Sequence, residues 1–205
     1  RPFRVPSLEE ELQFIQGLEK SFGRTLAVYI EFKAPAWHRE QGSPMEEKLL
    51  QLVHKYGYRK AEDPIFIQCF DPEGLRRMRN LGSQLRQVQL LGSNEWKEAP
   101  VNFDQLRAPE GLSLIREYAE GIGPWIPFCY TRESGEILSS GLVDQARENG
   151  LFVHPFTFRA DAYPEDFQTF ERLVTFFVEE LKVDGLFTDH PDRVLSIIES
   201  KPIQE

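Results

Sequence analysis

Runs of alternating and of continuous apolar residues predict five β-strands. In residues 25–33 every second residue is apolar, which is the pattern of a strand with one buried face, and Pro35 ends it. Residues 65–70 form a short apolar run that is typical of a buried strand. The other strands are expected over residues 88–91, 151–157 and 185–188, and residues 126–128 are a sixth candidate.

Apolar residues at helical spacing separate these strands. Ser7 and Glu10 have the spacing of a capping box, so we expect a helix to begin at residue 8. Asp71 is placed to cap a second helix, Gly57 to end another and Pro191 to open the last one. The expected helices cover residues 8–20, 44–56, 72–80, 110–119, 138–148, 164–182 and 191–199.

This alternation of strands and helices predicts an α/β fold with parallel strands and right-handed connections. Five or six strands are fewer than the eight of a closed barrel, although they suffice for a small open sheet. We expect residues 1–205 to form a single domain, because this length lies within the single-domain range. Residues 92–109 have little periodicity and exceed a usual βα loop, so we interpret them as a functional insertion or a lid.

The composition argues against two classes of binding surface. The formal net charge is −9 at pH 7, and the basic residues are too few and too scattered to follow the phosphates of a nucleic acid. No apolar run approaches the ~20 residues that span a bilayer, and the amino end has no signal-peptide pattern. Cys69 and Cys129 lack metal-ligand spacing and are expected to be free thiols.

Two charged residues stand at the end of the strand over residues 25–33. Because side chains alternate between the faces of a strand, Glu31 and Lys33 are predicted to share one face. The carboxyl ends of strands in a βα series are where barrels and open sheets hold their functional residues. Glu31 is suited to a hard cation and Lys33 to an anionic substrate. Solvated surface charges are the alternative for both residues.

Short motifs at the strand ends follow one another in an order that resembles a known family. They are Glu31-Phe32-Lys33, Gln68-Cys69-Phe70, Glu120-Gly121-Ile122-Gly123-Pro124, Val153-His154-Pro155-Phe156-Thr157 and Asp184-Gly185-Leu186-Phe187-Thr188-Asp189. Together they resemble the glycerophosphodiester phosphodiesterase family, and most closely its longer, periplasmic bacterial type. The resemblance covers nearly the whole chain.

The resemblance implies a TIM-barrel fold of the type found in the PLC-like phosphodiesterases. Members of the family carry a His-Arg-Gly, a Glu-x-Asp and a His-Asp motif on their first three strands, and none of these stands in its expected place here. The chain therefore resembles the carboxyl-terminal part of such an enzyme, starting just before the fourth strand. We accordingly expect an incomplete barrel without its catalytic residues, the family's histidines lying upstream of Arg1.

The resemblance also implies roles for six residues that are present. Glu31 would be a ligand of Ca²⁺ or Mg²⁺, and Lys33 would point at the substrate phosphate. The further substrate-binding residues are Gln68, Phe70, His154 and Phe156.

Each of these four has a specific expected contact. Gln68 would hydrogen-bond the substrate or a ligand, and the ring of Phe70 would line the pocket or belong to the core. His154 and Phe156 would line the glycerol end of the site, although a histidine at a strand end is often only hydrogen-bonded.

Other residues near the strand ends have plainer interpretations. Asp189 is expected to cap the closing helix. Trp37 and His38 are expected on a loop above the site, as substrate contacts or as packing residues. The glycines of 121–123 lack the third glycine and the following helix of a dinucleotide-binding loop.

The implied function is metal-dependent hydrolysis of a glycerophosphodiester, a small-molecule substrate, to sn-glycerol 3-phosphate and an alcohol in lipid and glycerol metabolism. We expect the 205-residue chain alone to be inactive, because the two histidines that serve as general acid and base would lie upstream. The resemblance implies a periplasmic location.

Two alternatives remain open at the level of sequence. The first is a non-catalytic module that binds a phosphate ligand and derives from the same fold. The second is a different TIM-barrel lyase or isomerase that uses Glu31 and Lys33. The sequence does not fix the alcohol group, the choice between Ca²⁺ and Mg²⁺ or the oligomeric state.

Overall fold

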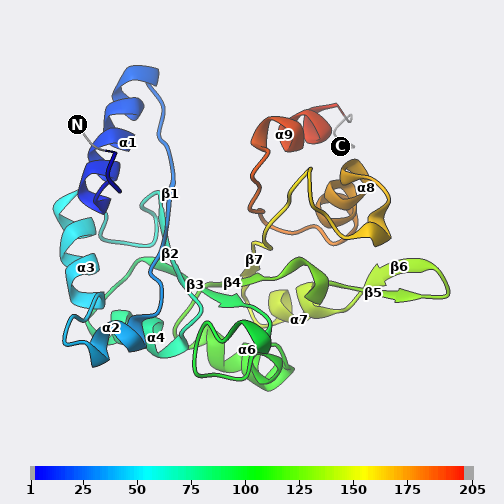
Figure 1. Cartoon of the computed structure of the whole chain (residues 1–205), viewed down its shortest axis with the longest axis horizontal. Coiled ribbons are helices and arrows are strands. Elements are labelled where there is room, and N and C mark those ends of the chain that lie inside the picture. Colours follow the sequence, from blue (N-terminus) through cyan, green and yellow to red (C-terminus); the bar gives the residue numbers. More distant parts are fainter. Residues whose placement is uncertain (1–2, 201–205) are drawn as a thin grey trace. The chain divides into compact units, whose positions relative to one another are not determined.

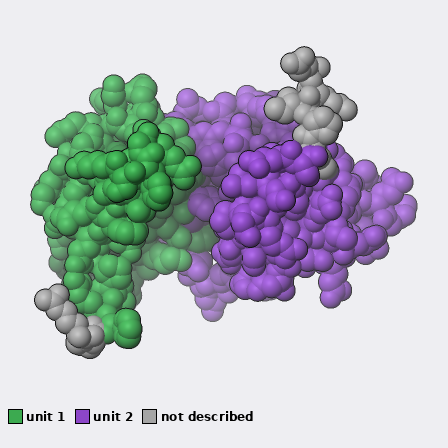
Figure 2. Space-filling model, turned by 90° about the horizontal axis from the view of Figure 1, so that it is seen from above, with its two compact units in different colours: residues 1–87 green, residues 88–205 purple. Residues whose placement is uncertain are grey.

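The computed structural model describes residues 3–200 and divides the chain into two compact units. The first unit comprises residues 1–87 and the second residues 88–205, as Figure 2 colours them. Each unit has its own buried core. Leu12, Val53, Ile65, Ile67 and Leu75 are fully buried in the first unit. The second is rich in buried aromatic rings, among them Phe103, Phe158, Phe167, Phe176 and Phe177.

The main sheet has five strands in the order β1-β2-β3-β4-β7. Their bounds are Val28–Glu31 for β1, Ile65–Cys69 for β2, Arg86–Leu91 for β3, Gly121–Pro124 for β4 and Phe152–Val153 for β7. β1 pairs in parallel with β2, and β4 pairs in parallel with both β3 and β7. The expected α/β fold with parallel strands is therefore confirmed.

The described part of the first unit, residues 3–87, contains the helices α1 (Leu8–Phe22), α2 (Pro35–Glu40), α3 (Glu46–Lys55) and α4 (Pro72–Asn80). The predicted capping box of α1 is present in both directions between Ser7 and Glu10. Asp71 caps α4 as predicted, because its side chain accepts a hydrogen bond from the backbone N–H of Glu73. Helix α2 was not predicted. Its six residues are too few to show a helical period.

The amino-terminal turns of α1 lie next to the carboxyl end of α3 in the first unit (Figure 1). Gln13 of α1 donates a hydrogen bond of 2.7 Å to the hydroxyl of Tyr56, the residue that ends α3. Gln16, one turn later on α1, donates a hydrogen bond of 2.9 Å to the carbonyl of Tyr56. These contacts fix the end of α3 where Gly57, with φ of 96°, turns the chain toward β2.

The second unit contains short helices around its strands. They are η1 (Asn94–Trp96), α5 (Phe103–Leu106), α6 (Pro109–Arg116), η2 (Ile126–Phe128), α7 (Leu142–Glu148), η3 (Glu165–Phe167), α8 (Phe170–Thr175), the π-helical η4 (Phe176–Glu180) and α9 (Pro191–Glu199). Pro191 is the first residue of α9, as predicted.

An antiparallel hairpin was missed in the sequence. Strands β5 (Tyr130–Glu133) and β6 (Glu136–Ser139) form a two-stranded ribbon in the second unit (Figure 1). Asp166 anchors this hairpin by accepting hydrogen bonds from Tyr130 at 3.1 Å and from Arg132 at 3.0 Å. Most residues of the hairpin are exposed, so hydrophobic periodicity gave no signal for it.

Several predicted boundaries in the second unit were wrong. The expected strand over residues 185–188 is reduced to an isolated bridge between Phe158 and Thr188. The expected helix over 164–182 is broken into η3, α8 and η4, and the strand candidate at 126–128 is the 3₁₀ turn η2. Tertiary contacts decide such segments, because their apolar runs fit more than one secondary structure.

Residues 92–109, predicted to be an insertion or a lid, are tied together by Asn94. Its side-chain oxygen accepts a hydrogen bond of 2.7 Å from the backbone N–H of Phe103, and its amide donates one of 2.9 Å to Asp104. Asn102 caps α5 in the same segment. The role of the segment stays a prediction. Among the described residues no helix has both the length and the apolar character needed to cross a membrane.

Candidate functional site

Glu31 and Lys33 stand at the end of β1, on either side of Phe32. The carboxylate oxygen Oε1 of Glu31 lies 3.1 Å from Nζ of Lys33. The Glu31 side chain is 23% exposed and the Lys33 side chain 69% exposed. The two charges therefore meet as the period-two pattern predicted, with a half-buried acid beside a solvent-facing ammonium.

Gln68 lies directly beside Glu31 on the neighbouring strand. The register of β1 against β2 pairs Glu31 with Gln68, and Gln68 is buried. Oε1 of each residue is buried and accepts no hydrogen bond from any residue in 3–200. Lys33 is near Glu31 Oε1 but is not in hydrogen-bond geometry. The Lys33 ammonium compensates the charge of Glu31, whereas the buried Gln68 oxygen has no donor within residues 3–200, which costs about 1–3 kcal/mol and is consistent with a binding function.

These two oxygen atoms fit a hard cation in ligand type but not in number. Ca²⁺ and Mg²⁺ prefer carboxylate and amide oxygens, and they take six or more ligands in total. Within residues 3–200 no group of three or more His, Cys, Asp and Glu residues is placed to hold a metal ion. Glu31 and Gln68 are thus suited to supply part of a coordination shell, with the other ligands coming from water, substrate or other parts of the protein.

Aromatic rings lie next to these polar residues on the same face of the sheet. The ring of Tyr29 stacks on that of Phe66 with a centroid distance of 4.7 Å. Tyr29 precedes Glu31 by two residues and Phe66 precedes Gln68 by two, so the stack follows both strands away from the site. Burial raises the pKa of the Tyr29 hydroxyl above its ordinary value. Phe70, beyond the end of β2, is half-buried.

His154 and Phe156 belong to the second unit and follow β7. The ring of His154 packs against Phe152 at a centroid distance of 4.6 Å. It also lies against the backbone of Gly185, where a Cβ atom would come within 2.9 Å of His154 Cδ2. His154 is held in the sheet, because its backbone N–H donates a hydrogen bond of 2.9 Å to Ile122.

Phe156 contributes to a half-exposed cluster of aromatic side chains. Trp96 of η1 packs edge-on against Trp125 with a centroid distance of 4.9 Å, and its ring centroid lies 6.5 Å from that of Phe156. Phe128 adds a further edge-on contact with Trp125, at 5.5 Å. Neither Trp96 nor Trp125 was predicted as a site residue, although Trp125 follows the 120–124 motif directly.

Three other residues differ from expectation. Asp189 does not cap α9; its carboxylate lies 3.4 Å from Nε of Arg159, while the N-cap residue His190 makes no side-chain capping bond. Trp37 and His38 lie on α2 rather than on a loop, with their ring centroids 4.8 Å apart. The absence of a helix period in this short segment explains that error.

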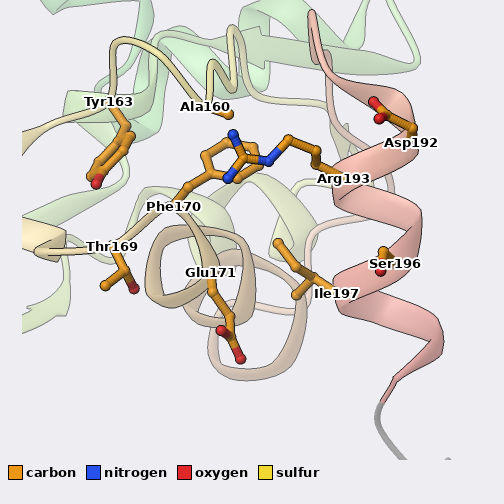
Figure 3. A pocket seen from close by; sticks show the side chains of 9 residues that line it. All are labelled: Ala160, Tyr163, Thr169, Phe170, Glu171, Asp192, Arg193, Ser196 and Ile197. Atoms are coloured by element: carbon orange, nitrogen blue, oxygen red, sulfur yellow. The ribbon is translucent and has the colours of Figure 1, made fainter.

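A pocket of about 640 Å³ in the second unit is lined by none of the predicted site residues. Figure 3 shows the side chain of Arg193 reaching from α9 across the ring of Phe170. The guanidinium carbon lies 5.6 Å from the ring centroid.

Two further features of the structure were missed in the sequence. Gly185, which makes room for His154, has no signal beyond its place in the last motif. Arg39, Glu46 and Asp71 form a buried ionic network beneath the end of β1. Charged residues normally indicate a solvated surface, so hydropathy alone gives no reason to bury Glu46.

Comparison with known proteins agrees with the motif order. The model of the glycerophosphoryl diester phosphodiesterase family matches residues 1–193. A glycerophosphodiester phosphodiesterase of Haemophilus influenzae is 34% identical over 208 aligned residues, covering 93% of this chain and 57% of that protein. A glycerophosphodiester phosphodiesterase of Treponema pallidum is 27% identical, with 93% and 58% covered. The chain thus spans less than three fifths of these relatives' length.

Solved structures show the same fold. A putative glycerophosphoryl diester phosphodiesterase of Silicibacter pomeroyi superimposes with a TM-score of 0.64 at 21% identity, covering 96% of this chain and 57% of that one. An Oleispira antarctica phosphodiesterase, solved in complex with the product sn-glycerol-3-phosphate, gives a TM-score of 0.61 at 15% identity, with 95% and 62% covered. The predicted fold of the TIM-barrel type is confirmed, and the chain belongs to the glycerophosphoryl diester phosphodiesterase family.

Proposed function

We propose that the protein containing this chain hydrolyses glycerophosphodiesters to sn-glycerol 3-phosphate and an alcohol. The observation that carries this proposal is the pair of buried oxygens on Glu31 and Gln68, which accept no hydrogen bond within residues 3–200 and lie beside Lys33. Membership of the family and the product named for the Oleispira antarctica relative support the same substrate class.

A divalent cation, Ca²⁺ or Mg²⁺, is part of the proposal. Glu31 Oε1 and Gln68 Oε1 would hold it through two oxygen atoms. When bound, such a cation supplies Lewis-acid polarisation of a phosphoryl oxygen and lowers the pKa of an attacking hydroxyl. Glu31 carries the negative charge of this pair, and Gln68 adds an oxygen without adding charge.

Lys33 is proposed to bind the phosphate. Its solvent-facing ammonium group lies 3.1 Å from Glu31, and this ion pair holds it at the strand end, where a substrate phosphate can reach it. Negative charge grows on the phosphoryl oxygens as the reaction proceeds, and a fixed ammonium compensates it. The neighbouring Glu31 keeps the ammonium at the strand end when no substrate is bound.

His154 and Phe156 are proposed to contact the glycerol or alcohol part of the substrate. His154 supplies a polar ring whose position is fixed by Gly185, and Phe156 supplies an apolar surface beside Trp96. The combination of one polar group with aromatic walls is common in small-molecule sites. We assign no general acid or base to this chain and propose that these groups lie elsewhere in the protein.

The test compares the complete protein with the 205-residue chain in a coupled assay for released sn-glycerol 3-phosphate. We expect the complete protein to turn over the substrate when a divalent cation is present. We expect no turnover by the isolated chain. Glu31→Gln, which removes one charge at constant shape, should lower kcat/KM by about 100-fold. Glu47→Gln is the matched control, because Glu47 is exposed on α3 and accepts a hydrogen bond from Gln51 of the same helix. Equal activity of the two variants would refute the assignment of Glu31.

A second candidate is a module that binds a phosphate ligand without hydrolysing it. The observation in its favour is that the described residues supply no cluster of three metal-binding side chains. Calorimetric titration of the complete protein with sn-glycerol 3-phosphate and Ca²⁺ separates the two functions. Affinity without turnover, under every divalent cation tried, would favour the module. The periplasmic location stays a prediction from resemblance.

A further inference from the structure

Arg39 of α2 joins two buried carboxylates. Its guanidinium contacts Oε1 of Glu46 through Nη1, and Oδ2 of Asp71 at 3.4 Å through Nη2. The side chains of Glu46 and Asp71 are only 4% and 3% exposed, and that of Arg39 is 19% exposed. Buried charges are tolerated when they are paired and hydrogen-bonded, so these three side chains act as one unit, which we call the Arg39 triad.

The triad connects α2 to the beginnings of two other helices. The second oxygen of Glu46 accepts a hydrogen bond of 3.1 Å from the backbone N–H of Met45, at the start of α3. The second oxygen of Asp71 accepts one of 2.9 Å from Glu73, in the first turn of α4. Every carboxylate oxygen of the triad therefore has a donor. Such fully satisfied networks are rigid.

Helix α2 depends on these contacts for its position. It has six residues, far fewer than an isolated helix needs to be stable. Its N-cap residue Ala34 has φ of 47° and offers no side-chain cap. Arg39 is the residue of α2 that forms ion pairs with both neighbouring helices.

The connection between β1 and α2 is only three residues long, and contacts with β2 and α4 hold it in place. The backbone N–H of Phe32 donates to the carbonyl of Gln68 at 3.2 Å, and its carbonyl accepts from the thiol of Cys69 at 3.0 Å. A Cβ atom on Gly74 of α4 would lie 2.9 Å from Phe32 and 2.9 Å from Pro35. The connection therefore packs directly on the backbone of α4.

Phe32 stands between the two residues of interest, and Pro35 follows them. Glu31 precedes Phe32 and Lys33 follows it, so a shift of α2 against α4 moves both charged side chains. Burial raises the pKa of the Cys69 thiol, and the nearby carboxylates of Asp71, Glu31 and Glu46 raise it further. The same sulfur accepts a hydrogen bond of 3.3 Å from the backbone N–H of Asp71, so Cys69 links a residue of the triad to the carbonyl of Phe32, next to Glu31.

We propose that the Arg39 triad is a positioning device that fixes Glu31 and Lys33 for cation and phosphate binding. Its consequence for turnover rests on the proposed hydrolase function. Arg39 acts through α2 and the connection to β1, without touching substrate. Arginine suits this task because its planar fork meets two carboxylates at once, which the single ammonium of lysine cannot do.

The test uses Arg39→Lys in the complete protein, with Arg77→Lys as the matched control. Arg77 is on α4 and forms an exposed ion pair with Glu73 at 2.9 Å, and within residues 3–200 it forms no hydrogen bond or ion pair with Arg39 or Asp71. For each variant we measure kcat/KM, the cation concentration at half-maximal activity, the thermal midpoint and hydrogen exchange of the peptide backbone.

Arg39→Lys should lower kcat/KM by about tenfold or more, because misplacing a substrate-binding group by a fraction of an ångström has effects of this size. The cation requirement should rise, and exchange should become faster in residues 31–40 while the remaining segments keep their rates. Arg77→Lys should leave all four quantities within twofold or within error.

Asp71→Asn is a second variant that separates positioning from helix capping. Asparagine caps a helix as well as aspartate does, so exchange in α4 should stay unchanged. The loss of one charge facing Arg39 should still loosen residues 31–40 and lower kcat/KM. Restored activity in Arg39→Lys at lower temperature, together with uniformly faster exchange, would show a merely structural role and overturn the proposal. So would an unchanged kcat/KM in a folded Arg39→Lys protein.

Failure of the proposed function has a different signature. A complete parent protein without diesterase activity would refute the hydrolase assignment. The exchange comparison would then still decide the positioning role. Faster exchange confined to residues 31–40 in Arg39→Lys supports the device, and identical exchange in Arg39→Lys and Arg77→Lys refutes it.

Discussion

The ring of His154 occupies the space that a side chain at Gly185 would fill. A Cβ atom on Gly185 would lie 2.9 Å from Cδ2 and 3.0 Å from Nε2 of the imidazole, closer than real contacts allow. The glycine therefore sets the orientation of a predicted substrate-binding residue, although it has no functional group of its own.

Gly185→Ala should displace His154 and destabilise the protein by about 1–3 kcal/mol, the range of overpacking substitutions. Denaturant unfolding measures the stability change, and the imidazole NMR signal of His154 reports the displacement. Gly17→Ala is the control: no atom lies within 4 Å of its Cβ position on α1, so it should stabilise by about 0.5–1 kcal/mol. An unshifted His154 signal in Gly185→Ala would contradict the packing argument.

Gln68→Met should separate activity from stability. The substitution removes a buried oxygen that lacks a hydrogen bond, so the free energy of unfolding should change by less than about 1 kcal/mol or increase. Because a ligand oxygen is lost, kcat/KM of the complete protein should fall and the cation requirement should rise. A loss of more than about 2 kcal/mol would instead show that Gln68 serves the fold.

The capping box of α1 should make the amino-terminal helix sensitive to acid. Hydrogen bonds from the Arg4 guanidinium and from the Ser7 backbone and hydroxyl lower the pKa of Glu10 from its ordinary 4.5 to about 2. A depressed pKa in the folded state stabilises above the unfolded value, so this contribution is present above about pH 4.5 and is lost as the pH falls toward 2.

Circular dichroism between pH 6 and pH 2 measures this effect. Glu10→Gln should weaken α1 at pH 6 and remove the part of the acid transition that Glu10 causes. Glu11→Gln leaves the capping box intact and serves as the control. Identical acid transitions in the parent and Glu10→Gln would refute the role of the box.

Both cysteines should be unreactive in the folded chain. Cys69 and Cys129 form no disulfide, as the sequence predicted; both are buried, and burial raises the pKa of both thiols. Because the thiolate is the reactive form, labelling by a disulfide reagent should be on the order of 100-fold slower than in denaturant. Ser43→Cys, at an exposed position, is the control and should react at once. Fast labelling of the parent would show local opening near Phe32 or η2.

Sequence patterns predicted the first unit better than the second. In the first unit the capping box of α1, the cap of α4 by Asp71 and the pairing of Glu31 with Lys33 all rest on interactions between residues close in sequence. In the second unit the hairpin depends on Asp166, more than 30 residues away, and the helix after Phe170 turns π-helical around buried rings. Local patterns do not encode such distant partners.

The candidate site shows the same limit. Gln68 was identified from its motif, but its alignment with Glu31 required the strand register, which no local pattern gives. The Arg39 triad was not predicted, because charged residues are expected to be exposed to water. The packing of α2 on α4 is what brings Arg39 to Asp71. His154 was predicted as a site residue, whereas Gly185, which makes room for its ring, was not.

The three-residue connection from β1 to α2 also restricts how the chain can change in length. Hydrogen bonds with Gln68 and Cys69 and packing on Gly74 hold this connection in place. One inserted residue would therefore break the contact with β2 or displace the connection from α4. The tip of the β5–β6 hairpin has no such restraint, since Ser134 and Gly135 are exposed. Insertions and deletions should therefore accumulate at that tip, while the connection keeps a constant number of residues.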